Sequence, residues 1–249
     1  MVFQDPMTSL SPLMKIGRQI EETIRQAEPK LSREEVRARA LDMLRRVHIP
    51  DPESRYDCYP HELSGGMRQR VMIAIALSCR PRIVIADEPT TALDVTIQKQ
   101  ILLLLQEMRR DMDLSVILIT HDLGVVAELC DRVVVLYGGL VMEEGEATEI
   151  FERPSHPYTL GLLASVPRVD QTREEKLYSI PGSPPDLLDP PAGCPFAARC
   201  PYARRVCLKA MPERTVLSDT HSSACWLLRS DAPIEGNPFR HGKGGVTDG

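Results

Sequence analysis

The sequence has few aromatic residues, no excess of basic charge and no long apolar run. Aromatic side chains make up 4% of the 249 residues, so the core must be mostly aliphatic. The formal net charge of −5 argues against a nucleic-acid binder, which usually carries a basic patch. No apolar run reaches the roughly 20 residues that span a bilayer, and the first residues lack the basic and apolar parts of a signal peptide. We therefore expect a cytosolic chain whose membrane role comes through a partner.

Short aliphatic segments alternate with helical patterns along the first part of the chain. The first four residues, Met-Val-Phe-Gln, have the pattern of a buried strand, and Ser32 with Glu35 forms a capping box. Periodicity predicts helices over 33–47, 68–79, 95–112 and up to about 129, and strands over 83–86, 115–120, 133–137 and 140–143. Buried aliphatic strands that alternate with helices indicate an α/β fold with a parallel sheet.

The composition changes near Arg153-Pro154-Ser155-His156-Pro157, after which the chain is rich in proline and cysteine. This change predicts an α/β domain over 1–153 and a small irregular module over 154–229. The polar, glycine-rich residues 230–249 are expected to be a disordered tail. The sequence contains no internal repeat.

The segment LSGGMRQR at 63–70 is the first candidate for a phosphate site. Its two glycines precede a predicted helix, so their backbone N–H groups are free to face outward. The Ser64 hydroxyl and the positive end of the helix would add to an anion site. A Ser-Gly-Gly turn is also common at ordinary helix starts, so it does not decide the function alone.

Carboxylates and an imidazole follow the predicted strands. Asp87 and Glu88 come directly after one apolar strand, and His121 follows the next. Parallel strands bring these ends to the same edge of a sheet. There Asp87 can hold Mg²⁺, Glu88 can polarise an attacking water, and His121 can contact a phosphate. A solvated pair of acids without a function is a common alternative. The histidine at the end of the neighbouring strand weakens this alternative.

Four of the seven cysteines crowd into one short stretch, with the spacing C-x5-C-x6-C-x17-C: Cys194, Cys200, Cys207 and Cys225. In a cytosolic chain such a cluster indicates metal binding more than disulfides. The tight C-x2-C pairs typical of zinc sites are absent, whereas four thiolates can also hold a [4Fe–4S] cluster. Iron–sulfur, zinc and free thiols all remain open.

The order of the motifs resembles that of the ATP-binding subunits of ABC transporters over residues 1 to about 150: a strand-end glutamine, then LSGGMRQR, RIVIADEPTTALD and ITHD. The resemblance implies a partial P-loop NTPase fold, with a helical subdomain and a parallel sheet core. It implies ATP and Mg²⁺ as ligands and assigns these roles: Gln4 as the Q-loop glutamine near Mg²⁺, Ser64, Gly65 and Gly66 as the signature motif, Asp87 as the Walker B aspartate, Glu88 as the catalytic glutamate, Asp94 as the D-loop aspartate and His121 as the switch histidine. Met67 occupies the position after the signature motif at which glutamine is the commonest residue in the family that the sequence resembles.

Further motifs resemble the oligopeptide/dipeptide importers, and extend the match to about Trp226: Tyr59-Pro60-His61-Glu62, Arg153-Pro154-Ser155-His156-Pro157-Tyr158-Thr159, Gly193-Cys194-Pro195-Phe196 and Arg199-Cys200-Pro201. This resemblance favours the [4Fe–4S] interpretation of the cysteines. It implies a second ABC ATPase subunit in a head-to-tail dimer, two membrane permease subunits and, indirectly, an extracytoplasmic solute-binding protein. The expected location is peripheral, on the cytoplasmic face of the inner membrane.

The sequence contains no P-loop of the form G-x-x-x-x-G-K-[ST]; Gly242-Lys243-Gly244 lies in the polar tail and lacks the Ser/Thr. We therefore expect a chain truncated before the Q-loop that is poorly stable and hydrolyses little or no ATP alone. The alternative is a non-catalytic subunit that contributes only the signature half-site to a partner ATPase. A DNA-acting ABC ATPase and an iron–sulfur protein with a degenerate fold are further alternatives that the acidic charge and the lack of a redox partner disfavour.

Overall fold

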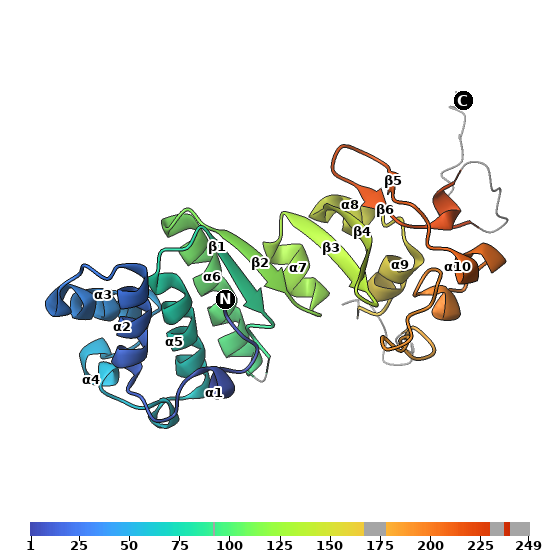
Figure 1. The fold of residues 1–249 in the computed structure, drawn as a ribbon. Helices are drawn as coiled ribbons and strands as arrows, with labels where there is room; N and C mark the ends of the chain where they lie inside the picture. The colour runs from blue at the N-terminus through green and yellow to red at the C-terminus, as the bar shows by residue number, and fades with distance from the viewer. Residues whose placement is uncertain (92, 167–177, 230–236, 240–249) are drawn as a thin grey trace. The chain divides into compact units, whose positions relative to one another are not determined.

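The computed structural model describes residues 1–91, 93–166, 178–229 and 237–239. The chain divides into two compact units, Met1–His121 and Asp122–Gly249 (Figure 1). The boundary near residue 153, taken from composition, stays a prediction. The disorder expected for 230–249 falls outside the described residues except at 237–239, where the Asn237 side chain donates to the Leu227 carbonyl at 2.7 Å.

The first unit contains a group of helices whose apolar faces meet. The bounds are α1 Pro6–Ser9, α2 Ile16–Ala27, α3 Arg33–Arg46, α4 Pro52–Tyr56, the 3₁₀ turn η1 Pro60–Glu62, α5 Gly65–Ser78 and α6 Val95–Asp111. The predicted capping box is present at the start of α3, where the Ser32 side chain accepts from the Glu35 N–H. Aliphatic side chains at helical spacing, such as Ile16, Ile20 and Ile24 of α2, are fully buried and form the core of this unit.

Two parallel strands complete the first unit, β1 at Ile83–Asp87 and β2 at Ser115–Ile119. They pair in register so that Asp87 lies opposite Ile119. The strand expected at residues 1–4 is reduced to one bridge, in which Val2 exchanges hydrogen bonds with the backbone of Ile85 and Asp87.

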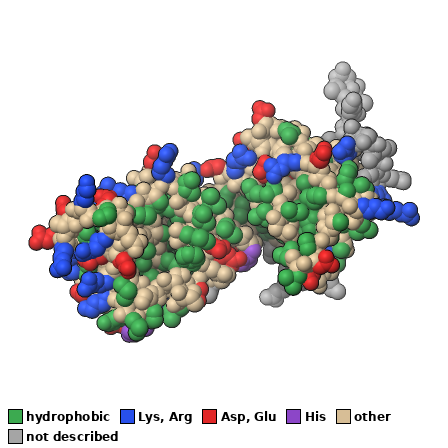
Figure 2. Space-filling view, viewed as in Figure 1, with side chains coloured by type: hydrophobic (Ala, Val, Ile, Leu, Met, Phe, Trp, Pro, Cys, Tyr) green, Lys and Arg blue, Asp and Glu red, His purple; other side chains and the backbone are tan. Residues whose placement is uncertain are grey.

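The expectation of buried strands holds for only one face of β1 and β2 in the described residues. Exposure alternates along both strands, and Ile83 is 58% and Ile117 51% exposed. The covered face of the strands joins the helical core, whereas the opposite face has no described layer packed over it. Figure 2 shows apolar side chains at the surface of the molecule.

The second unit is built around an antiparallel sheet with the strand order β3-β4-β6-β5. Its elements are α7 Leu123–Leu129, β3 Arg132–Tyr137, β4 Leu140–Glu146, α8 Ala147–Glu152, α9 Pro157–Ala164, η2 Ala197–Arg199, α10 Arg205–Lys209, β5 Thr215–Val216, β6 Ser222–Ser223 and η3 Trp226–Leu228. Gly138 and Gly139 adopt positive φ angles of 58° and 77°, so they form the tight turn that joins β3 to β4, as predicted.

A buried carboxylate ties three segments of the second unit together. Glu143 of β4 is completely buried and accepts hydrogen bonds from the backbone N–H groups of Ser155 at 2.5 Å and His156 at 3.0 Å. The Nε2 atom of His221 lies 2.8 Å from the same carboxylate. These contacts fix the start of α9 and the segment before β6 against the sheet. In neither unit does a described helix have the length and apolar character needed to cross a membrane.

Candidate functional site

The C-terminal end of β1 carries a strained turn. Asp87 is the last residue of the strand, and Glu88 follows it with a φ angle of 42°. The Glu88 N–H donates to the Ile119 carbonyl of β2 at 2.9 Å, which fixes the turn against the neighbouring strand. A left-handed conformation costs a non-glycine residue roughly 1–3 kcal/mol and occurs preferentially at functional sites.

Three side chains from separate parts of the first unit converge on the Glu88 carboxylate. The Gln4 amide donates to Oε2 at 2.8 Å, and the Thr91 hydroxyl donates to the same oxygen at 2.7 Å. The His121 Nδ1 atom lies 3.1 Å from Oε1. The parallel pairing of β1 and β2 thus brings the predicted residues Glu88 and His121 together at one sheet edge, and the bridge of Val2 to β1 brings Gln4 to them.

The electrostatics of this site suit a carboxylate that acts on water. The hydrogen bond from Thr91 and then the one from His121 lower the pKa of Glu88. The Glu88 side chain is 26% exposed and that of His121 is 79% exposed, so solvent reaches both groups. An ionised, oriented and accessible carboxylate can accept a proton from an attacking water. Asp87 lies one residue away, and carboxylates are suitable Mg²⁺ ligands.

Thr91 is a fourth member of this group that the sequence motifs did not predict. The only signal was its position three residues after Glu88 in the segment DEPTT. The turn returns Thr91 to Glu88 because the Thr91 N–H donates to the Glu88 carbonyl at 3.1 Å.

The signature residues lie at a helix start, with one difference from the prediction. Ser64 is the N-cap of α5, so Gly65 and Gly66 form its first turn rather than preceding it. The Ser64 hydroxyl accepts from the Met67 N–H at 3.3 Å. A Cβ atom on Gly66 would lie 2.8 Å from Cγ2 of Ile97, so glycine permits the close approach of α5 to α6.

Asp94 is likewise an N-cap, whose carboxylate accepts from the Ile97 N–H at 3.0 Å at the start of α6. Ser64, Gly65, Gly66 and Asp94 are therefore positioned by the packing of two helix N-termini. None of their described hydrogen bonds connects them to the Glu88 carboxylate.

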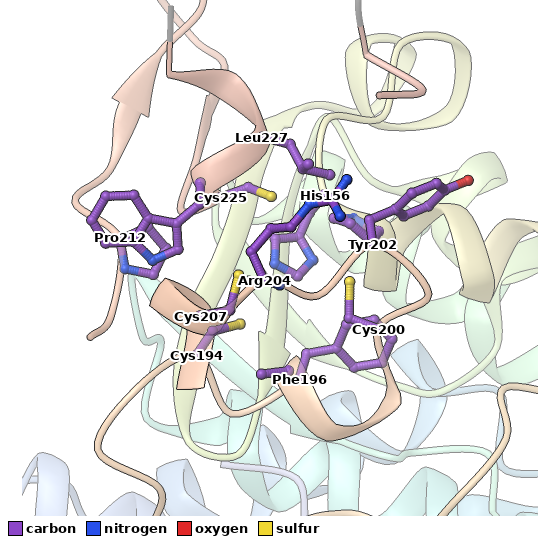
Figure 3. Close-up of a pocket in the computed structure, with 13 residues that line it drawn as sticks. His156, Cys194, Phe196, Cys200, Tyr202, Arg204, Cys207, Pro212, Cys225 and Leu227 are labelled. Atoms are coloured by element: carbon purple, nitrogen blue, oxygen red, sulfur yellow. Dashed lines mark hydrogen bonds between the residues drawn. The ribbon is translucent and has the colours of Figure 1, made fainter. Parts of the chain in front are cut away.

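All four cysteines of the C-terminal cluster line one small cavity in the second unit, of about 20 Å³ (Figure 3). That volume holds about one water molecule. Burial raises the pKa of the Cys200 thiol to about 11 and that of Cys225 to about 12, and it also raises the pKa of Cys194. These groups are therefore neutral thiols at pH 7 unless a metal displaces their protons.

The cavity does not have the arrangement of a metal centre. In the described part of the chain no group of three or more His, Cys, Asp or Glu side chains is arranged to hold a metal ion. The four cysteines predicted to bind a [4Fe–4S] cluster therefore line one cavity. Their thiols are not close enough together there to form a ligand set. His156 also lines the cavity, and its Nδ1 atom accepts from the Tyr158 N–H at 3.0 Å. In the sequence His156 stands out only as part of the motif at 153–159.

Two family models match the chain. An ABC transporter model matches residues 1–91, and a model described as the oligopeptide/dipeptide transporter C-terminal region matches residues 142–207. The chain is also similar to solved structures of ATP-binding cassettes. With cbiO1 from Clostridium perfringens it shares 34% identity and a TM-score of 0.53, over 61% of this chain and 58% of that one. With the cassette MJ0796 bound to ADP and Pi the values are 33% and 0.51, over 59% of this chain and 62% of that one.

Similarity to bacterial proteins is strong along most of the sequence. The oligopeptide transport ATP-binding protein OppD of Bacillus subtilis is 54% identical over 94% of this chain and 65% of its own length. The dipeptide transport protein DppD of B. subtilis is 56% identical over 91% of this chain and 67% of its own, and DppD of Escherichia coli 50% over 93% and 70%. The chain thus spans about two thirds of the length of these relatives. It belongs to the family of ATP-binding subunits of oligopeptide and dipeptide ABC transporters.

Proposed function

We propose that the chain is the ATP-binding and ATP-hydrolysing subunit of an ABC importer for peptides. The observation that carries this proposal is the Glu88 carboxylate at the strained end of β1, bonded to Gln4, Thr91 and His121. The names of the relatives, which are oligopeptide and dipeptide transport proteins, support peptides as the transported solute.

In the proposed reaction Glu88 accepts a proton from the water that attacks the γ-phosphate of ATP. His121, exposed beside Glu88, contacts the γ-phosphate and steadies its developing charge. Asp87 and the amide oxygen of Gln4 are hard oxygen donors that fit Mg²⁺. When bound, Mg²⁺ neutralises phosphate charge. The Gln4 amide nitrogen is already directed to Glu88, so its oxygen is the atom left for the metal.

The proposed assembly joins this chain to a second ATPase subunit and to membrane subunits. The 249 residues contain no P-loop, so we propose that they hydrolyse little or no ATP by themselves. Ser64, Gly65, Gly66 and Asp94 would act on the nucleotide site of a second ABC ATPase subunit in a head-to-tail dimer. The Q-loop and the helices between Thr8 and Cys79 would contact two membrane permease subunits at the cytoplasmic face of the membrane. An extracytoplasmic solute-binding protein would deliver the peptide.

A non-catalytic subunit is the second candidate. In that case the chain would contribute only the signature half-site formed by Ser64, Gly65 and Gly66, and the Glu88 site would be idle. The three hydrogen-bonding side chains around Glu88 favour the catalytic proposal, because an idle carboxylate needs no such arrangement.

The proposal is tested by uptake of a labelled peptide into proteoliposomes that contain the transporter with its permease, partner ATPase and binding protein. We expect uptake to require ATP and this subunit, and we expect the 249-residue polypeptide alone to show no hydrolysis above background. Peptide uptake without this subunit would overturn the proposal. Uptake that persists when Glu88 is replaced by glutamine would favour the non-catalytic alternative.

We propose as well that the four clustered cysteines hold a [4Fe–4S] cluster with a structural role. In its favour, four thiols surround one cavity, which is the donor set that such a cluster needs; the thiols would have to draw together to bind it. We expect about four iron and four acid-labile sulfide per anaerobically purified chain, lost in Cys225→Ser but kept in the control Cys79→Ser, an exposed cysteine outside the cavity. Iron-free protein with four titratable thiols, or one zinc ion, would contradict the proposal.

A further inference from the structure

We propose that Thr91 is a positioning residue that anchors Oε2 of Glu88 and thereby makes Oε1 the oxygen that accepts the proton from water. This inference rests on the proposed function, since it assigns roles to the two oxygens of the proposed base. A carboxylate has two oxygens that are equivalent in solution. In this site they have different partners.

Oε2 accepts hydrogen bonds from two donors. The Thr91 hydroxyl lies 2.7 Å from it and the Gln4 amide nitrogen 2.8 Å. An oxygen with two hydrogen-bond donors has both of its lone pairs occupied and cannot readily take another proton. Of these donors Thr91 is the fixed one, because its backbone N–H is bonded to the carbonyl of Glu88 itself. Gln4 reaches the site from 84 residues away and is exposed.

Oε1 has one described hydrogen-bond partner, the exposed side chain of His121. The Nδ1 atom of His121 lies 3.1 Å from it, and the His121 side chain is 79% exposed. When His121 turns to a phosphate, Oε1 is free to face water, while Oε2 is still held by Thr91. The threonine therefore fixes the rotation of the carboxylate about its last torsion, which is otherwise broad.

The test uses the assembled transporter and three variants. Thr91→Val removes the hydroxyl at nearly the same shape, and Thr91→Ser keeps a hydroxyl. Thr90→Val is the matched control, because the described hydrogen bonds of Thr90 are made by its backbone carbonyl, which accepts from the Gln98 side chain and from the Leu93 N–H. For each variant and for the wild type, ATP hydrolysis is measured as kcat and as KM for ATP.

Thr91→Val is expected to lower kcat about tenfold and to leave KM for ATP unchanged, because the lost hydrogen bond is to a charged group at the reacting oxygen. Thr91→Ser should restore kcat, and Thr90→Val should match the wild type.

The outcomes separate the two proposals. If wild-type transporter hydrolyses ATP and Thr91→Val has the same kcat, the role of Thr91 is wrong and the proposed function stands. If Thr91→Val and Thr90→Val lose activity equally, the effect is one of folding and the role of Thr91 is also rejected. If the wild type itself hydrolyses no ATP, the proposed function fails first.

Discussion

Replacing Glu88 with glutamine is expected to lower the kcat of ATP hydrolysis by the assembled transporter by about 10²–10⁴-fold, with ATP still bound. Glutamine is nearly the same size and can keep the hydrogen bond from Thr91, so the turn at the end of β1 should persist. An amide cannot accept the proton of an attacking water at neutral pH. The measurement is steady-state phosphate release together with nucleotide binding on the same preparation.

A control for Glu88→Gln removes a carboxylate elsewhere in the first unit. Glu107 on α6 has a side chain 39% exposed and an ion pair with His48 at 3.6 Å. Exposed pairs of this kind contribute about 0–1 kcal/mol to stability, so Glu107→Gln should hydrolyse ATP like the wild type. Equal rates for Glu88→Gln and wild type would show that the carboxylate is not the base.

Replacing Glu143 with alanine should lower the free energy of unfolding of the second unit by about 3–5 kcal/mol. The carboxylate is fully buried, and its loss leaves the N–H groups of Ser155 and His156 and the ring of His221 without their acceptor. A buried N–H group without an acceptor destabilises the folded state by its full desolvation free energy. Chemical denaturation followed by the fluorescence of Trp226, which lies in this unit, measures the effect.

The matched control is the next residue along β4. Glu144 has a side chain 25% exposed and accepts from Arg214 at 2.7 Å, so Glu144→Ala should cost no more than about 1 kcal/mol. If the two variants unfold at the same denaturant concentration, the buried carboxylate does not hold the segments of this unit together.

Much of the site could be predicted because it depends on strand geometry. Two apolar segments ending in Asp87-Glu88 and near His121 predict parallel strands with a shared edge, and the parallel pairing of β1 with β2 is found. The helix at Arg33–Arg46 was predicted from its capping box, which acts within a few residues.

The remaining features depend on contacts that the local sequence does not encode. Thr91 reaches Glu88 only because Glu88 takes a positive φ angle, and a pattern of residue types does not specify that angle. The pairing of Glu143 with His221 spans 78 residues and joins β4 to the segment before β6.

The most direct test of Glu88 as the hydrolytic base of a peptide importer is to measure phosphate release and peptide uptake in the same proteoliposomes, with wild-type and Glu88→Gln subunits. We expect the wild type to couple the two processes and Glu88→Gln to lose both while still binding ATP, because the bonded Glu88 carboxylate is the proposed base. Peptide uptake and phosphate release at wild-type rates with Glu88→Gln would contradict this role of Glu88.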